Sequence, residues 1–249
     1  MEPSQNLIPT LIGVAIMVAV ATAALMIFRV RAPWAPAAAI ARGVIQLAII
    51  SLILGGIITN PLWIALALLV MLGVAVSVAT HRIGWGARSA LVMATSIAAG
   101  IAVAATAVFG SGALDPTPRY ALAIGAIVIG NTMNIATLTG RIFAVSVADH
   151  WDEVEGWLAL GATARQSTIH LARRAVREAL IPSIDQTKTT GLVVLPGAFV
   201  GAIFGGLSPL EAGRFQIIVL AAIMAAGAVT AVLVATWQGA VTARIAAPA

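Results

Sequence analysis

The chain has 249 residues, of which 61% are hydrophobic and 9% are charged, with a formal net charge of +5. Soluble globular domains are about 25% charged and about 45–50% apolar, so this composition excludes an ordinary soluble domain and indicates an integral membrane protein. The 14 basic residues form no stripe of the kind that binds nucleic acid, and the lack of cysteine excludes disulfides and thiolate metal sites.

Seven apolar runs are each long enough to cross a bilayer as a helix, which takes about 20 residues. The runs cover approximately 7–29, 40–59, 62–80, 90–110, 120–140, 187–206 and 214–238. Most are apolar on all sides, whereas the strands of a membrane barrel alternate, so helices are favoured. The sequence predicts an all-α integral membrane protein with about seven transmembrane helices in a single domain over residues 1–249. The first run exceeds a signal-peptide core, and we expect it in the mature protein.

The basic residues predict the orientation of the chain. If seven spans start from an outside N-terminus, twelve of the fourteen basic residues fall on the inner side, as the positive-inside rule requires. These twelve are Arg29, Arg31, Arg42, Arg82, Arg88, Arg141, Arg165, Arg173, Arg174, Arg177, Lys188 and Arg244. We therefore expect a multi-pass protein of the cell membrane with its C-terminus in the cytoplasm.

One segment outside the apolar runs is long and patterned. Residues 149–185, between the fifth and sixth runs, hold six of the nine acidic residues. Residues 149–160 predict a short helix, because acidic side chains in its first turn favour the positive end of the helix dipole. Gly161 ends that helix, and the segment is predicted to project into the cytoplasm.

A second helix is expected over residues 164–181, closed by Pro182. Thr163 and Gln166 have the spacing of a capping box, which marks its start. This helix is amphipathic, with an apolar face and an arginine face, which comprise Ile169, Ala172, Val176 and Leu180, and Arg165, Arg173 and Arg177. One interpretation is a helix lying on lipid headgroups. The other is a cytoplasmic elbow, two helices hinged at a glycine, that docks another protein and transmits its motion.

Several segments carry a family resemblance. Glu-Gly-Trp-Leu-Ala-Leu-Gly-Ala at 155–162, continuing to Ala-Leu-Ile-Pro at 179–182, resembles the Glu-Ala-Ala loop of ABC transporter permeases. More specifically, the chain resembles the FetB-like family of iron-export permeases. This resemblance rests on Arg-Gly-Val-Ile-Gln-Leu at 42–47, Gly-Asn-Thr-Met-Asn at 130–134, Leu-Ala-Leu-Gly-Ala-Thr at 158–163, Arg-Glu-Ala-Leu-Ile-Pro-Ser-Ile-Asp at 177–185 and Lys-Thr-Thr-Gly-Leu-Val-Val-Leu-Pro-Gly at 188–197.

The resemblance implies a permease that forms a homodimer and couples ATP hydrolysis by a separate ABC-type ATPase subunit to solute export, the solute being iron or another metal. It implies that the coupling residues are Glu155, Leu158, Gly161, Ala162 and Thr163. The residues agree that the chain carries no ATP site of its own, because its only lysine, Lys188, follows a threonine and not the glycine of a phosphate-binding loop. We expect no enzymatic activity and no cofactor.

Polar residues in or beside the apolar runs are candidates for a transport pathway, because such groups are costly in lipid. Arg42 and Gln46 lie one helical turn apart in the second run. Asn131 and Asn134 share nearly one face of the fifth run, with Met133 beside them. The structural alternatives are that Arg42 snorkels to the interface and that the three amide side chains bond neighbouring helices.

The sixth run adds further candidates. Lys188 begins this run three residues after Asp185, and the two side chains are expected to pair at the inner mouth of the pathway. Pro196 is predicted to interrupt the run near its centre, as in the broken helices of transporters. The glycines that follow recur every fourth residue and predict a smooth groove for helix packing, namely Gly197, Gly201 and Gly205.

The substrate stays open at this stage. Divalent metals prefer carboxylate, imidazole or thiolate ligands, and the middle of every predicted span lacks Asp, Glu, His and Cys. His81, His150 and His170 lie in loops or the elbow without metal-ligand spacing. Arg42 and Lys188 suit an anionic solute such as a nucleotide-linked sugar. Two further alternatives are a secondary transporter that needs no partner and a membrane-embedded enzyme that acts on lipid.

Overall fold

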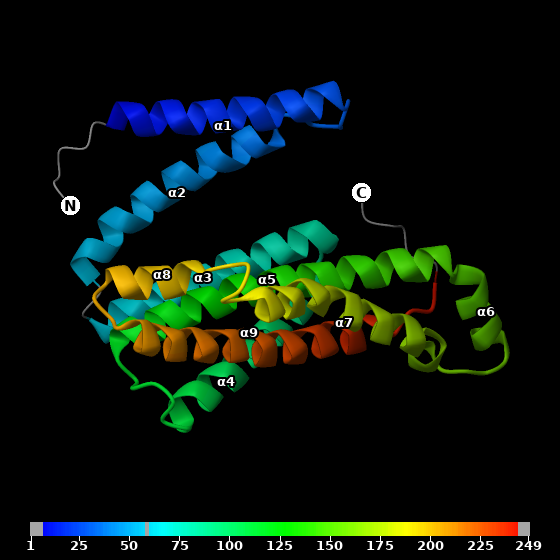
Figure 1. Cartoon of the computed structure of the whole chain (residues 1–249). Helices are drawn as coiled ribbons and strands as arrows, with labels where there is room; N and C mark the ends of the chain where they lie inside the picture. The colour runs from blue at the N-terminus through cyan, green and yellow to red at the C-terminus, as the bar shows by residue number, and fades with distance from the viewer. Residues whose placement is uncertain (1–6, 58–59, 244–249) are drawn as a thin grey trace. The chain divides into compact units, whose positions relative to one another are not determined.

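The computed structural model describes residues 7–57 and 60–243, and the regular elements in these ranges are all helices (Figure 1). This confirms the predicted all-α membrane fold. The chain divides at Asn60 into two compact units, which are described separately. Arg244 and the last two residues of the second predicted run, 58 and 59, lie outside the described residues.

The first unit is a helical hairpin. Its helices are α1 (Leu7–Ile27) and α2 (Ala35–Ile57), and both are long and apolar enough to span a membrane. The chain reverses between them through Arg29 and Ala32, which both adopt a positive φ. Most described side chains of this hairpin are exposed. Its surface is therefore available to lipid or to other protein segments.

The second unit is a bundle built around its last helix. It comprises α3 (Pro61–Ile83), α4 (Ala87–Gly110), α5 (Pro118–Asp149), α6 (Trp151–Ala159), α7 (Ala164–Thr189), α8 (Gly197–Phe204) and α9 (Pro209–Gln238). Helix α9 packs against α4, α5 and α7, and α3 covers α5 and α4. Four of these helices are long and apolar enough to cross a bilayer, namely α3, α4, α5 and α9.

Three of these helices start with the same local device, a polar cap followed directly by proline. The caps are Asn60, Thr117 and Ser208, at the starts of α3, α5 and α9. Each cap side chain accepts a hydrogen bond from a backbone N–H of the first turn, and proline at the first helical position has no N–H left unsatisfied. These helices therefore begin where the sequence places their start signals.

The core lies where small residues let α4 and α9 approach closely. Ala104 of α4 and Ala226 of α9 are buried in one cluster with residues of α5. A side chain at Gly100 would collide with Thr230 of α9. Close backbone approach of this kind is how helices associate in a membrane, where apolar burial alone favours no particular partner.

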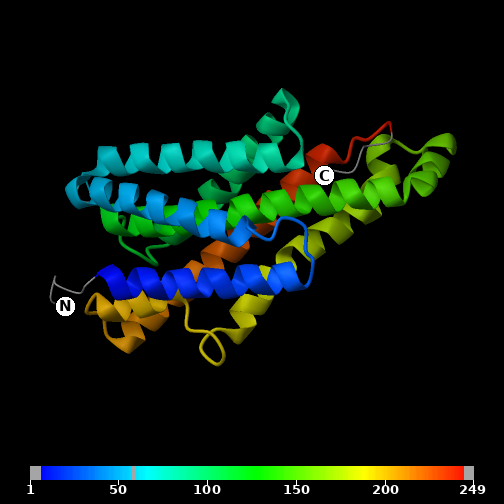
Figure 2. The same ribbon diagram turned by 90° about the horizontal axis from the view of Figure 1, so that it is seen from above.

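The predicted sixth span is wrong as a continuous helix. Its residues form the last turn of α7, a connection over residues 190–196, and the short helix α8. Gly191 has a φ of 86°, which ends regular helix, and Pro196 disfavours helical geometry at the residue before it. In both views α7 and α8 nevertheless lead the chain from the α6 end of the bundle to the end where α9 begins (Figures 1 and 2).

Two predicted helix ends are also wrong. Pro182 lies inside α7, which continues to Thr189 because Ala179 and Ser183 are buried on either side of the proline and hold the helix in place. The proline removes one backbone hydrogen bond without ending the helix. Helix α5 extends nine residues beyond the expected 140, since Phe143 and Val147 pack in a buried cluster with α7 and α9.

Candidate functional site

The elbow has the helix-glycine-helix form that the sequence predicts. Helix α6 ends at Ala159, and Gly161 reverses the chain with a φ of 89°, a conformation that favours glycine. Thr163 then caps α7: its backbone N–H donates to Gln166 Oε1 at 2.9 Å, and its Oγ1 accepts from the Gln166 N–H at 3.4 Å. The predicted capping box is confirmed.

Helix α6 is fastened to the bundle from one side. Val154 is fully buried in a cluster with Phe143 of α5 and Leu171 of α7, and Leu158 packs against the same cluster. Leu158, a predicted coupling residue, thus faces inward and anchors the elbow. The elbow is therefore a packed extension of the bundle, in which α6 contacts both α5 and α7.

The opposite side of the elbow is exposed and concave. Leu160 is 81% exposed and Trp157 is 49% exposed, and both line an open hollow of about 680 Å³ with Gly161 and Ala162. The imidazole of His170 on α7 lies 3.5 Å from the Glu153 carboxylate of α6 and links the two helices across this hollow. Glu155 and Thr163 are exposed but do not line this hollow. Apolar side chains presented on a hydrophilic projection are typical of a protein docking surface.

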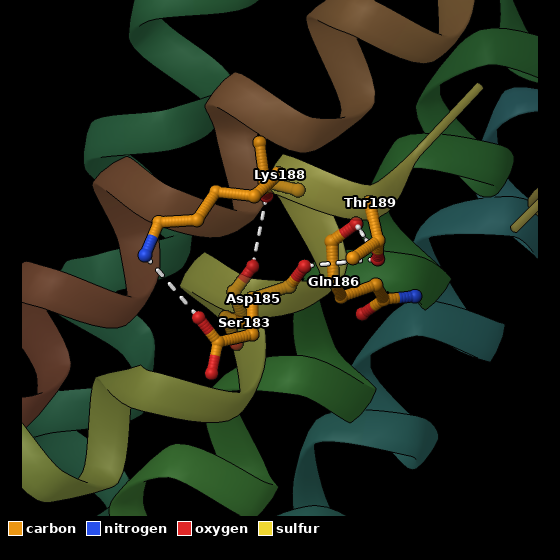
Figure 3. A network of polar contacts seen from close by, with 6 residues as sticks. Ser183, Asp185, Gln186, Lys188 and Thr189 are labelled. Carbon is orange, nitrogen blue, oxygen red and sulfur yellow. Dashed lines mark hydrogen bonds and ion pairs between the residues drawn. The ribbon is translucent and has the colours of Figure 1, made fainter. Parts of the chain in front are cut away.

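A charged face runs along α7 from the elbow. Arg174 Nε donates to Glu178 Oε1 at 2.7 Å, and this hydrogen bond, together with the negative charge of Glu178, raises the pKa of the Arg174 guanidinium. Further along, Lys188 Nζ lies 3.3 Å from Asp185 Oδ1, and both side chains are exposed (Figure 3). The predicted pairing of Asp185 with Lys188 is confirmed.

The last turn of α7 is closed by threonine hydroxyls. Thr187 Oγ1 donates to the Ser183 carbonyl at 2.8 Å. Thr189 Oγ1 donates to the Asp185 carbonyl at 2.9 Å (Figure 3). Thr190 Oγ1 makes the same kind of bond to the Gln186 carbonyl at 2.8 Å, and that carbonyl has lost its helical N–H partner because the helix stops at Thr189. The charged end of α7 is thereby held in regular helix up to the non-helical connection that follows.

The predicted pathway residues on α5 point in different directions. Asn131 is half-buried, and its Nδ2 donates to the Ile127 carbonyl of its own helix at 2.9 Å, while Asn134 is exposed. Met133 is not part of that surface and packs against the buried cluster of α3, α4 and α9 that contains Ala136. The structure thus brings Asn134 to an open face of α5 and turns Met133 inward.

The remaining predicted residues lie elsewhere. Arg42 and Gln46 are exposed on α2, in the first unit. Pro196 is the N-cap residue of α8. The space where side chains at Gly197 and Gly201 would project is open, and Gly205 ends α8, so the glycine groove has no packing partner within the described bundle.

Sequence reasoning missed a second hollow, of about 370 Å³, between α5 and α7. Its polar lining includes Arg141, Asp149, Arg174 and Glu178. The signal was present as polar residues continuing beyond the expected end of the fifth span, but that span was ended too early. Within residues 7–57 and 60–243, no group of three or more His, Asp or Glu side chains is arranged to hold a metal ion.

These features define a class: a multi-pass, all-helical membrane protein with a packed elbow that projects from one end of its bundle. The family model described as "Uncharacterised protein family (UPF0014)" matches residues 8–241, and the chain belongs to this family. No solved structure matches the chain.

Three named proteins are similar to this chain. The "UPF0014 membrane protein STAR2" of Oryza sativa subsp. japonica is 39% identical over 197 residues, which cover 78% of this chain and 69% of that protein. The "Protein ALUMINUM SENSITIVE 3" of Arabidopsis thaliana is 36% identical, covering 78% and 71%. The "Probable iron export permease protein FetB" of Escherichia coli strain K12 is 35% identical over 127 residues, covering 51% and 48%. The resemblance to FetB-like proteins is confirmed.

Proposed function

We propose that this chain is the permease subunit of an ABC transporter, which dimerises and couples ATP hydrolysis by a separate ATPase subunit to export of a solute. The observation that carries the proposal is the elbow, with exposed Leu160 and Trp157 on one side and buried Val154 on the other. A partner protein can bind to the exposed side of such a projection, while its buried side packs against the helices of the bundle.

Helix α7 would transmit a displacement of the elbow along the bundle. This helix runs from the elbow cap without a break for 26 residues, about 39 Å at 1.5 Å per residue. Displacement of α6 therefore reaches the charged end of α7 at Asp185 and Lys188, and then α8. A continuous helix that links a docking surface to polar residues in the bundle can act as a lever for alternating access.

Dimerisation is proposed because the charged face of α7 needs a polar environment. Asp185 and Lys188 are exposed, and such side chains in membrane proteins face a water-filled cavity or a protein interface. A second copy of the chain against this face would provide a protein interface and enclose a polar cavity. It would also give the open glycines of α8 a packing partner. The lining of the pathway is proposed to include Asn131, Asn134 and Lys188.

The proposed solute is iron or another metal, because a relative bears the name of an iron export permease. An anionic solute is the second candidate, and it is favoured by the exposed cations Arg42 and Lys188 and by Arg141 in the hollow between α5 and α7. Assay of both solutes in proteoliposomes that contain the complete transporter decides between them. A chain that moves solute without any ATPase would be a secondary transporter.

The coupling proposal is tested by co-purification with the ATPase subunit. Leu160→Asp places a charge on the docking surface without disturbing a buried side chain, and we expect loss of the bound ATPase. Ala159→Asp is the matched control, because it adds the same charge at a neighbouring exposed position outside the hollow. ATPase recovery that is equal for the two variants, both folded by gel filtration, would refute the elbow as the docking site.

A further inference from the structure

A groove runs between α7 and α9 at the elbow end of the bundle and has a volume of about 320 Å³. Its floor is small and apolar, with Ala172 of α7 and Ala235 of α9 both buried. Val176 and Val232 form its walls, and Val232 is 52% exposed. The groove is thus an open slot with a mostly apolar lining.

The groove is held open by a specific contact. Thr168 is fully buried, and its hydroxyl donates to the carbonyl of Gly239 at 2.8 Å. This bond joins the start of α7 to the end of α9, while the small side chains at Ala172 and Ala235 leave the space beyond it unfilled. The slot is therefore a consequence of how the two helices are tied together.

Two arginines line the groove. Arg165 and Arg173 both belong to α7 and are eight residues apart, about 12 Å along the helix axis. Neither pairs with a carboxylate of the described chain, and the lining of the groove contains no acidic residue. The guanidinium group binds phosphate through two parallel hydrogen bonds, so the rim is complementary to a phosphate ester.

The depth of the groove matches a membrane surface. Its α9 wall, from Val232 to Gly239, comprises the last turns of an apolar spanning helix. Trp237 is partly exposed in the same turns, and tryptophan is enriched at the level of lipid headgroups. At the level of the headgroups, a phospholipid presents both its phosphate and the start of its acyl chains.

We propose that the groove binds an anionic phospholipid, with an acyl chain along Ala172, Val176 and Val232 and the phosphate between Arg165 and Arg173. The apolar slot accounts for binding of the acyl chain. The two arginines, which pair with no carboxylate of the described residues, favour a headgroup with a net negative charge over a zwitterionic one. The bound lipid would bridge α7 and α9. This proposal needs no ATPase partner and stands independently of the proposed transport function.

The test uses the full chain purified in a neutral detergent and titrated with phosphatidylglycerol, with phosphatidylcholine of the same acyl chains in parallel. The readout is the thermal unfolding temperature, Tm. We expect phosphatidylglycerol to raise the Tm of the wild type and phosphatidylcholine to have a much smaller effect. In the R165Q/R173Q variant the apparent affinity for phosphatidylglycerol should fall at least about tenfold. Arg177→Gln is the matched control, because Arg177 is an exposed arginine of the same helix that does not line the groove.

Two further measurements separate the parts of the proposal. Val232→Trp fills the slot without changing the charge and should remove the response to phosphatidylglycerol. Inorganic phosphate at the same concentration should not change the Tm. An unchanged lipid response in R165Q/R173Q or in Val232→Trp would overturn the lipid site, and so would an equal response to inorganic phosphate, which would indicate a site for soluble anions.

Discussion

The hydroxyl of Thr230 on α9 donates a hydrogen bond to the backbone carbonyl of Ser96 on α4, 3.2 Å away, and both residues are fully buried. The two are 134 positions apart in the chain. The bond forms only because Gly100, one turn after Ser96, leaves room for the Thr230 side chain. A glycine thus sets the distance between the two helices with the most extensive mutual packing in the bundle.

Replacement of this glycine should destabilise the bundle. In Gly100→Ala the new Cβ would lie 2.6 Å from the Ala226 carbonyl oxygen and also meet Thr230, so the helices must separate. We expect a loss of about 1–3 kcal/mol and a lower Tm in detergent. Gly73→Ala in α3 is the control, since its Cβ has open space. Equal Tm values for the two variants would contradict the close-contact account.

Removal of the elbow cap should loosen the start of α7. Thr163→Ala deletes the side-chain acceptor of the Gln166 N–H, which we expect to cost about 1 kcal/mol. Hydrogen exchange should accelerate at the first turn of α7, while Thr163→Ser, which keeps the hydroxyl, should remain close to the wild type. Unchanged exchange in Thr163→Ala would mean that packing alone holds the elbow.

Substitutions in the exposed ion pair of Asp185 and Lys188 should affect stability and transport differently. Lys188→Gln should change the stability by less than about 1 kcal/mol, because solvent-exposed pairs contribute little. If the solute is anionic and Lys188 lines the pathway, export by the complete transporter should fall at least about tenfold, because the solute loses a charge-assisted contact, as measured by solute flux. Asp185→Asn, which keeps the cation, is the comparison and should export normally. Normal flux in Lys188→Gln would remove Lys188 from the proposed pathway.

The proposed orientation can be tested with single cysteines, because the natural chain contains none. Ala159→Cys lies at an exposed position of α6, and Ala113→Cys lies at an exposed position in the connection between α4 and α5. In intact cells a membrane-impermeant thiol reagent should label position 113, and it should label position 159 only after the membrane is opened. The reverse pattern would place the elbow outside and exclude a cytoplasmic ATPase partner.

Features whose partners are close in sequence were predicted correctly. The capping box joins Thr163 to Gln166, and the charge pair joins Asp185 to Lys188, three residues apart in each case. The glycine hinge depends on the backbone of a single residue, Gly161. Long apolar runs without alternation predicted the all-helical membrane fold, because only hydrogen-bonded helices or closed barrels satisfy the backbone in lipid and the strands of a barrel alternate.

Features that depend on competition between local signals and packing were predicted less well. Pro182 is a local helix-ending signal, yet burial of its neighbours keeps α7 intact to Thr189. The apolar run at 187–206 has the length of a span, but Gly191 and Pro196 divide it. Burial of Phe143 and Val147 extends α5 beyond the apolar run in which it begins.

By itself, the sequence determined the membrane class, most of the spanning helices and the elbow, because hydropathy, capping and hinge geometry are set by residues within a few positions of one another. Only the tertiary structure decided the inward direction of Met133, the groove tied by Thr168 and Gly239, and the contact of Ser96 with Thr230. The latter two pairs are 71 and 134 positions apart, and such separations leave no local pattern. Their proximity arises when whole helices pack.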